Sequence, residues 1–126
     1  MTDSPADSAS LPRVTLLYGD DHQAIRDRVN LLAAQMGDPS MADMNISRLD
    51  GAAQGTNEDD VRTAAYTLPF LSARRMVIVT NPALVMKSDS ARQKFLDMLV
   101  NLPETTALVL AQDDIWLTGK EQRGWK

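Results

Sequence analysis

Two unbroken apolar runs constrain the fold of this chain most strongly. Met76–Val79 and Ala107–Ala111 each hold only apolar residues. Runs of this length are typical of strands in a parallel sheet that is covered on both faces, because no alternate position faces water. The sequence therefore predicts buried strands over 75–80 and 106–111.

Helical patterns separate these strands from each other and from two further strands. The other predicted elements are strands over 14–18 and 45–49 and helices over 22–36, 57–68 and 89–102. Gly37 is a natural stop for the first helix and Pro69 for the second. Strands that alternate with helices of about 10–15 residues predict right-handed βαβ units and hence an α/β domain with a doubly wound parallel sheet.

The turn between the first strand and the first helix lacks the groups that bind a nucleotide. In a P-loop this turn reads GxxxxGK[ST], and its backbone N–H groups and lysine hold the phosphates. Here it reads Gly19-Asp20-Asp21, and two carboxylates would repel a triphosphate. Carboxylates at a helix N-terminus cap free N–H groups and complement the helix dipole, so we expect Asp20 and Asp21 to have that role.

The other positions where such a domain carries catalytic or metal-binding side chains also lack them. A nucleotide-hydrolysing domain holds its metal with acidic residues after the third strand, where this chain has Thr80-Asn81-Pro82. The single histidine, His22, is interpreted as an exposed residue of the first helical turn. The sequence predicts no catalytic residue, no nucleotide site, no metal site and no cofactor.

Charge and composition limit the cellular compartments and the classes of partner that we expect for this chain. The chain of 126 residues carries a net charge of −4, which argues against a surface that mainly binds nucleic acid. It has no cysteine, which excludes disulfides and fits the reducing cytosol. No apolar run approaches the roughly 20 residues of a membrane span. We therefore expect a cytoplasmic protein without membrane contact.

Both ends of the chain differ in character from its middle. Residues 1–12 are polar, acidic and rich in Ser, Ala and Pro, and we interpret them as a disordered leader rather than a signal peptide. The polar tail 119–126 carries a tryptophan and has no stop signal, which is typical of the middle of a longer protein. The sequence predicts one domain over 13–126, as a fragment of a longer chain.

An apolar loop follows the second predicted helix. Leu68-Pro69-Phe70-Leu71 places three large apolar residues around a proline, shortly before the basic pair Arg74-Arg75. Leu68 also continues the apolar stripe of the helix, and we expect Leu71 in the core. Two interpretations stay open for Leu68 and Phe70: burial over the sheet edge, or exposure as anchors for a partner protein.

Four segments occur in an order that is known from one family. They are Tyr18-Gly19-Asp20-Asp21, Leu49-Asp50-Gly51, the block Thr67–Val79 and the strand Thr105–Leu110. In this order and spacing they resemble the N-terminal domain of the bacterial DNA polymerase III delta subunit, which is part of the sliding-clamp loader. The block Thr67–Val79 is the most specific piece.

The resemblance implies an AAA+ fold with three layers, similar to a P-loop NTPase, and a degenerate site that binds no ATP. It implies the sheet order 1-4-3-2, with strand one at the edge where a fifth strand would pair, and lid and collar domains beyond residue 126. By position, Leu68, Pro69 and Phe70 are the implied clamp-binding residues. Ala65 stands where clamp-binding peptides often carry a glutamine.

The implied function is that of a clamp-loader subunit without chemistry of its own. Such a subunit binds the sliding clamp, which is the beta subunit, and opens it for loading onto DNA during replication. The implied partners are the clamp and the loader subunits tau/gamma and delta-prime. DNA is contacted only through the full DNA polymerase III holoenzyme.

Two alternatives to this function stay open. One is an unrelated flavodoxin-like or response-regulator-like domain, although Asn81 stands where a response regulator carries an aspartate. The other is a delta-prime or similar loader subunit, but delta-prime usually carries zinc-binding cysteines, and this chain has none.

Overall fold

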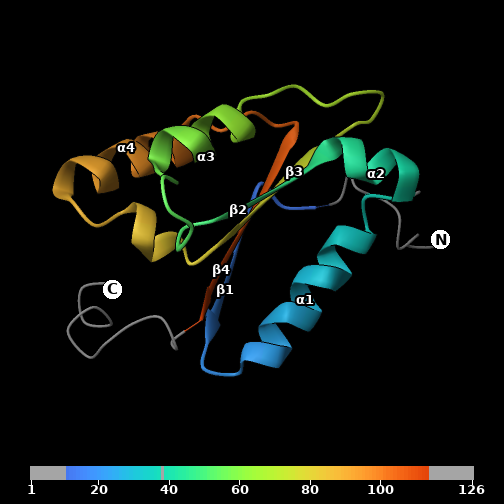
Figure 1. Cartoon of the computed structure of the whole chain (residues 1–126). Helices are drawn as coiled ribbons and strands as arrows, with labels where there is room; N and C mark the ends of the chain where they lie inside the picture. The colour runs from blue at the N-terminus through green and yellow to red at the C-terminus, as the bar shows by residue number, and fades with distance from the viewer. Residues whose placement is uncertain (1–10, 38, 114–126) are drawn as a thin grey trace.

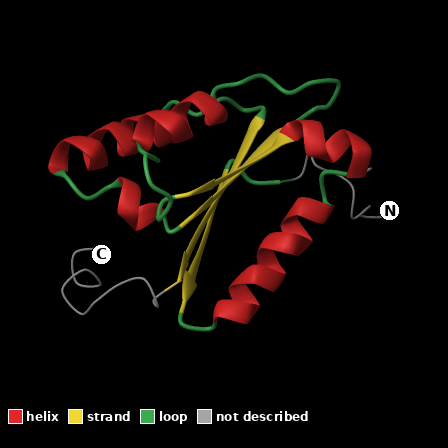
Figure 2. Ribbon diagram, in the orientation of Figure 1, coloured by secondary structure: helices red, strands yellow, loops and turns green. Residues whose placement is uncertain are grey.

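A parallel sheet lies between two layers of helices (Figures 1 and 2). The computed structural model describes residues 11–37 and 39–113. The strands are β1 (Val14–Gly19), β2 (Ile46–Asp50), β3 (Arg75–Thr80) and β4 (Thr106–Asp113). The helices are α1 (His22–Ala34), α2 (Pro39–Asn45), α3 (Glu58–Ala65) and α4 (Asp89–Val100), with a short 3-10 helix, η2 (Pro82–Val85). In Figure 1, α1 and α2 cover one face of the sheet, and α3, α4 and η2 cover the other.

The strand order is β1-β4-β3-β2, and every neighbouring pair is parallel. This confirms the predicted order 1-4-3-2 and the position of β1 at an edge among the described strands. The flavodoxin-like and response-regulator-like alternative is wrong. Those folds have the strand order 2-1-3-4-5, in which β1 lies between β2 and β3, whereas here β1 pairs with β4.

Two apolar cores lie on opposite faces of β3 and β4. Because side chains alternate along a strand, the two central strands supply both cores. On the α1 face the sheet contributes Met76, Ile78, Ala107, Val109 and Ala111, and on the α3 and α4 face it contributes Val77, Val79, Leu108 and Leu110. The buried strands predicted from the two apolar runs are confirmed.

The edge strand β1 is covered less completely than its neighbours. Val14, Leu16 and Tyr18 are 39%, 54% and 46% exposed, whereas the alternate residue Leu17 packs against the core on the α1 face. The apolar row on the exposed side of β1 therefore lies beside the core on the α3 and α4 face without belonging to it.

The segment between α1 and β2 differs from the sequence expectation. The first helix ends at Ala34, two residues before the predicted end, and Gly37 has a positive φ of 99°, which suits its predicted role as a stop. The unpredicted helix α2 begins at Pro39. Proline is well suited to the first turn of a helix, where its missing N–H would have no helical partner.

The predicted leader, residues 1–12, lies largely outside the described residues. Leu11, near its end, is 7% exposed and packs in the core on the α1 face. Its carbonyl oxygen accepts a hydrogen bond from the Arg74 guanidinium at 2.8 Å. The packed part of the chain therefore includes Leu11, two residues before the predicted boundary.

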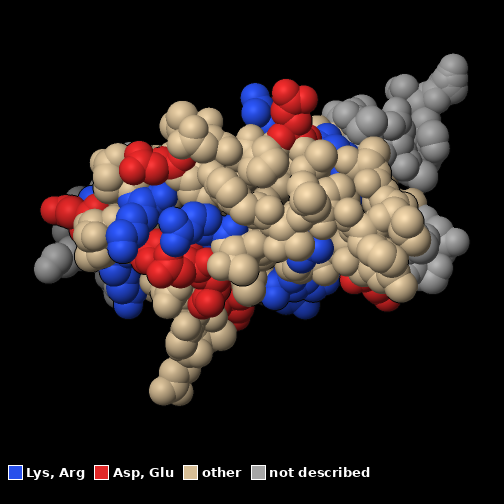
Figure 3. All heavy atoms as spheres, turned by 90° about the horizontal axis from the view of Figure 1, so that it is seen from above, with Lys and Arg blue, Asp and Glu red and all other residues tan. Residues whose placement is uncertain are grey.

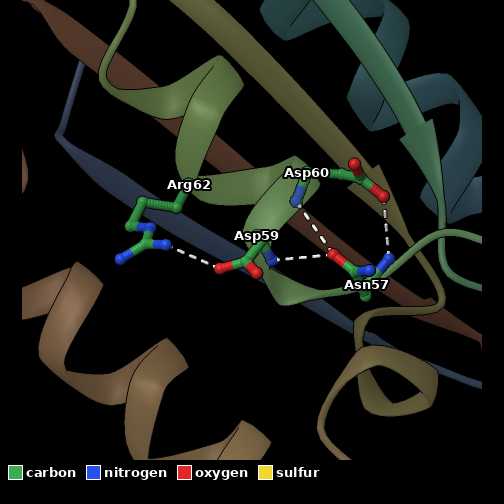
Figure 4. A network of polar contacts seen from close by, with 4 residues as sticks. All are labelled: Asn57, Asp59, Asp60 and Arg62. Carbon is green, nitrogen blue, oxygen red and sulfur yellow. Dashed lines mark hydrogen bonds and ion pairs between the residues drawn. The ribbon is translucent and has the colours of Figure 1, made fainter.

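A capping box begins α3 (Figure 4). The Asn57 side chain accepts hydrogen bonds from the backbone N–H groups of Asp59 and Asp60, at 2.9 and 3.2 Å, and the Asp60 carboxylate accepts one from the Asn57 N–H at 2.9 Å. Arg62 forms an exposed ion pair with Asp59 on the same turn. The predicted start near residue 57 is therefore fixed by local hydrogen bonds.

A close backbone contact joins the carboxyl ends of β2 and β3. The Gly51 N–H donates to the Thr80 carbonyl at 2.8 Å, and a Cβ at Gly51 would lie 2.2 Å from the Asn81 carbonyl oxygen. The Asp50 carboxylate accepts hydrogen bonds from the Asn81 side chain and the Ala52 N–H, at 3.0 and 2.9 Å. Desolvation raises the pKa of Asp50, but these hydrogen bonds outweigh it and the pKa is lowered from its ordinary value.

Replacing Asn57 by alanine should lower the free energy of unfolding by about 1 kcal/mol, because two backbone N–H groups lose their acceptor. Urea denaturation followed by circular dichroism measures the change. Arg62→Ala is the matched control on the same turn, and it should cost at most about 0.5 kcal/mol because it removes only an exposed ion pair. Equal losses in the two variants would contradict the capping role of Asn57.

The Asp50 carboxylate should stabilise the fold at neutral pH and not in acid. Because its folded-state pKa is lowered, its contribution is present above the unfolded pKa of about 3.9 and is lost as the pH falls through the folded-state pKa. Wild type should therefore be more stable than Asp50→Asn at pH 7, and this difference should shrink towards pH 3. Urea denaturation of both proteins at several pH values tests this, and a difference that does not change with pH counts against it.

Candidate functional site

An exposed apolar loop, residues 66–74, joins α3 to β3 at the end of the molecule where the strands begin (Figure 1). Within it, Leu68, Phe70 and Leu71 are 74%, 53% and 76% exposed. Figure 3 views the molecule from this end and shows a broad central area without charged side chains. Exposed large apolar side chains grouped in one short segment are typical of a protein contact.

Both ends of the apolar loop are tied to the body of the domain. Where the loop leaves α3, the Tyr66 hydroxyl donates to the Met98 carbonyl at 3.1 Å, and the Thr106 hydroxyl donates to the Ala65 carbonyl. Where it enters β3, the buried Arg74 guanidinium donates to the carbonyls of Leu11 and Thr106, at 2.8 and 2.9 Å. Burial, with the nearby charge of Arg13, lowers the pKa of Arg74 from its ordinary value, but guanidinium stays charged in proteins.

The middle of the apolar loop is held by Asn45, the last residue of α2. The Asn45 side-chain oxygen accepts from the Phe70 N–H at 2.6 Å, and its nitrogen donates to the Phe70 carbonyl at 2.8 Å. Asn45 is 1% exposed. The backbone of Phe70 is thus held by two hydrogen bonds, while the residue stays 53% exposed.

The structure excludes one of the two interpretations of Leu68 and Phe70, namely burial over the sheet edge. Leu68 and Phe70 are exposed, as anchors for a partner require, and Pro69 between them is partly buried. The expectation that Leu68 continues the buried stripe of the helix is wrong, because α3 ends at Ala65. The expectation that Leu71 is a core residue is also wrong. Neither core includes Leu71: it is 76% exposed, and its backbone turns there with a positive φ of 54°.

The turn where a P-loop would bind phosphates lies at the opposite end of the sheet. The Asp21 side chain accepts from the Ala24 N–H at 3.0 Å and caps α1, as predicted. The same prediction for Asp20 is wrong, because Asp21 is the N-cap and Asp20 is exposed just before it. A Cβ at Gly19 would meet no atom within 4 Å, so this glycine is not required by a close backbone contact. The described geometry is that of a capped helix start.

A cavity of about 300 Å³ lies beside this turn, between α1 and the carboxyl ends of the sheet strands. Its lining combines apolar side chains with His22, Arg26, Arg48 and Asp50. His22 is exposed, as predicted, and its Nε2 accepts from the Arg26 guanidinium at 2.6 Å. Over the described residues, no three His, Cys, Asp or Glu side chains are grouped so as to hold a metal ion, and no helix is long and apolar enough to span a membrane.

Sequence reasoning found the apolar loop and missed the residue that holds it. Asn45 lies 25 residues before Phe70, and the sequence expectation places it at the start of a strand. A polar residue at the start of a predicted strand carries no signal of a distant hydrogen bond. The unpredicted helix α2 is what brings it under the loop.

Comparisons with known proteins agree with the family resemblance of the sequence. The chain matches the family model described as DNA polymerase III, delta subunit, over residues 16–120. A search of curated proteins finds no match. Among solved structures, the Bacillus subtilis DNA clamp loader delta protein has a TM-score of 0.66 at 23% identity, covering 90% of this chain and 35% of that one. A DNA polymerase III gamma subunit-related protein from Thermotoga maritima has a TM-score of 0.65 at 21% identity, covering 92% of this chain and 40% of that one.

These solved structures establish the fold, and the family model establishes the family. The chain has the three-layer, AAA+-like parallel fold that the resemblance implied, with carboxylates in place of the P-loop motif. It spans 35% and 40% of the length of the two solved chains. Since the family model matches most of its residues, this chain belongs to the DNA polymerase III delta subunit family.

Proposed function

We propose that this chain is the clamp-contacting domain of a clamp-loader delta subunit. In this role it binds the sliding clamp, the beta subunit, and helps to open it for loading onto DNA. The observation that carries the proposal is the apolar loop, which exposes Leu68 and Phe70 from a backbone fixed by hydrogen bonds. Membership of the delta subunit family supports the same role.

The proposed contact is the insertion of Leu68 and Phe70 into an apolar pocket of the clamp, with Pro69 between them. Proline has a fixed φ and restricts the residue before it, so the spacing of the two anchors varies little in the free domain. Large side chains that are exposed in the free protein and buried in the complex dominate the energy of such contacts. Ala65 stands where a glutamine would supply a further polar contact, and it is fully buried at the end of α3. The affinity for the clamp is therefore expected to come from the two anchors.

The proposed function includes no chemistry by this domain. Clamp opening then depends on binding alone, and binding shifts an equilibrium only by its difference in affinity for the open and the closed clamp. The proposed partners besides the clamp are the tau/gamma and delta-prime subunits, and DNA is contacted only through the full complex. Residues 13–126 are the proposed first domain of such a subunit, in the cytoplasm.

Truncating both anchors should weaken clamp binding at least 100-fold. Each large side chain that becomes buried is worth about 1.5–3 kcal/mol, so Leu68→Ala/Phe70→Ala removes several kcal/mol from the complex. The free domain should melt at nearly the wild-type temperature, because both side chains are exposed. Surface plasmon resonance against the cognate clamp, with circular dichroism of each protein, measures both quantities.

The matched control is Leu96→Ala/Val100→Ala on α4. These apolar residues are 46% and 80% exposed, and they lie outside the apolar loop. Their truncation should change the affinity less than threefold. An unchanged affinity in the Leu68→Ala/Phe70→Ala protein would remove the loop from the clamp contact, and so would equal losses in the two double variants.

The domain should bind neither ATP nor ADP. Asp20 and Asp21 place carboxylates where phosphates would lie, no lysine follows Gly19 in the turn, and Asp21 already occupies an N–H group of the helix start. Titration of a fluorescent ATP analogue with low-micromolar protein should give no saturable signal. Saturable binding that ATP displaces would overturn the degenerate-site interpretation.

A further inference from the structure

We infer that Asn45 is a positioning residue, which holds the backbone of the anchor Phe70 in the conformation that binds the clamp. This inference rests on the proposed function, since it assigns the preorganisation of the same loop. Asn45 ends α2 and does not belong to the apolar loop, and its side chain is 1% exposed. It therefore cannot contact a partner protein directly and acts through Phe70.

The contact has a geometry that fixes a backbone. One carboxamide meets both polar groups of one residue, with 2.6 Å between the Phe70 nitrogen and Asn45 Oδ1 and 2.8 Å between Asn45 Nδ2 and the Phe70 oxygen. Two antiparallel hydrogen bonds to one residue resemble the hydrogen-bonded pair of an antiparallel sheet, and they restrict its rotation about both φ and ψ. The pair needs a donor and an acceptor bonded to the same planar carbon, which at neutral pH only the carboxamides of Asn and Gln provide.

The loop needs such a restraint at this place. The next residue, Leu71, has a positive φ of 54°, a conformation that is unfavourable for a leucine and persists only where neighbouring contacts impose it. The two tied ends of the loop lie at residues 65–66 and at Arg74, so Asn45 supplies the hydrogen bonds between them that hold the anchor.

Asn45 is expected to raise the affinity for the clamp by ordering the loop before binding, and not by contacting the clamp. A loop that is already fixed loses less conformational freedom when it binds, and the affinity rises accordingly. Loss of the Asn45 hydrogen bonds should therefore weaken binding although every anchor side chain is still present. The effect should depend on Phe70, because the anchor ring is what the hydrogen bonds position.

The test compares Asn45→Leu with wild type in the full chain. Leucine has the same number and branching of side-chain heavy atoms as asparagine and makes no hydrogen bond, so affinity for the cognate clamp should fall about tenfold, which corresponds to about 1.4 kcal/mol. In a Phe70→Ala background the same substitution should change the affinity less than twofold. A simple loss of stability would act equally in both backgrounds, so this double-mutant cycle isolates the positioning role.

Two further measurements keep the test decisive. Val61→Ala removes two methyl groups from a fully buried side chain of α3 and should lower stability without altering the Asn45 contact, and its clamp affinity should stay within twofold of wild type. Hydrogen exchange of the wild-type chain should show protection of the Phe70 amide, and this readout requires neither a variant nor the clamp. An unprotected Phe70 amide overturns the inference even if Asn45→Leu fails to fold.

The outcomes separate this inference from the proposed function. If Leu68→Ala/Phe70→Ala loses binding while Asn45→Leu binds like wild type, the positioning role is overturned and the clamp contact stands. If the Asn45→Leu loss is the same with and without Phe70, the residue is structural and the inference fails. If wild type does not bind the clamp at all, both the proposed function and the inference fail.

Discussion

The parallel pairing of β3 with β4 is the interaction on which the rest of the packing depends. Its register runs from Arg75 opposite Thr106 to Thr80 opposite Ala111, and the strands send alternate side chains into the two cores. A shift of one residue would exchange the faces of every side chain, so the register is strongly determined. The same pairing places Arg74 beside Thr106, where their hydrogen bond sets the end of the apolar loop.

The central elements were predictable because burial on both faces leaves a strong pattern. β3 has the predicted bounds, and β4 extends two residues further than expected. The intervening short elements were not predictable in the same way. α2 and η2 each begin at a proline, which reads equally well as a break in the chain, and only packing against the sheet decides between the two.

The candidate site was predictable in its residues but not in its construction. Leu68 and Phe70 stand out because apolar residues surround a proline after a helix, yet periodicity alone would bury Leu68 and composition alone would bury Leu71. The exposure of Leu68 follows from the end of α3 at Ala65, three residues earlier. The Asn45 contact joins residues 25 positions apart through a polar side chain, and no local pattern reports such a hydrogen bond.

The position of the apolar loop at the starting end of the strands has a consequence for how the sequence can change. The helix cap at Asp21 lies at the other end, beyond six-residue strands that span about 20 Å. The hydrogen bonds from Asn45 to Phe70 and from Arg74 to Leu11 and Thr106 lie at the starting end of the strands, away from the turn after β1. The sheet thus behaves as a spacer between two independent ends. Because the phosphate-binding position of a P-loop and the apolar loop lie at opposite ends of the sheet, substitutions at one end need not alter the shape of the other, and the two features can change separately.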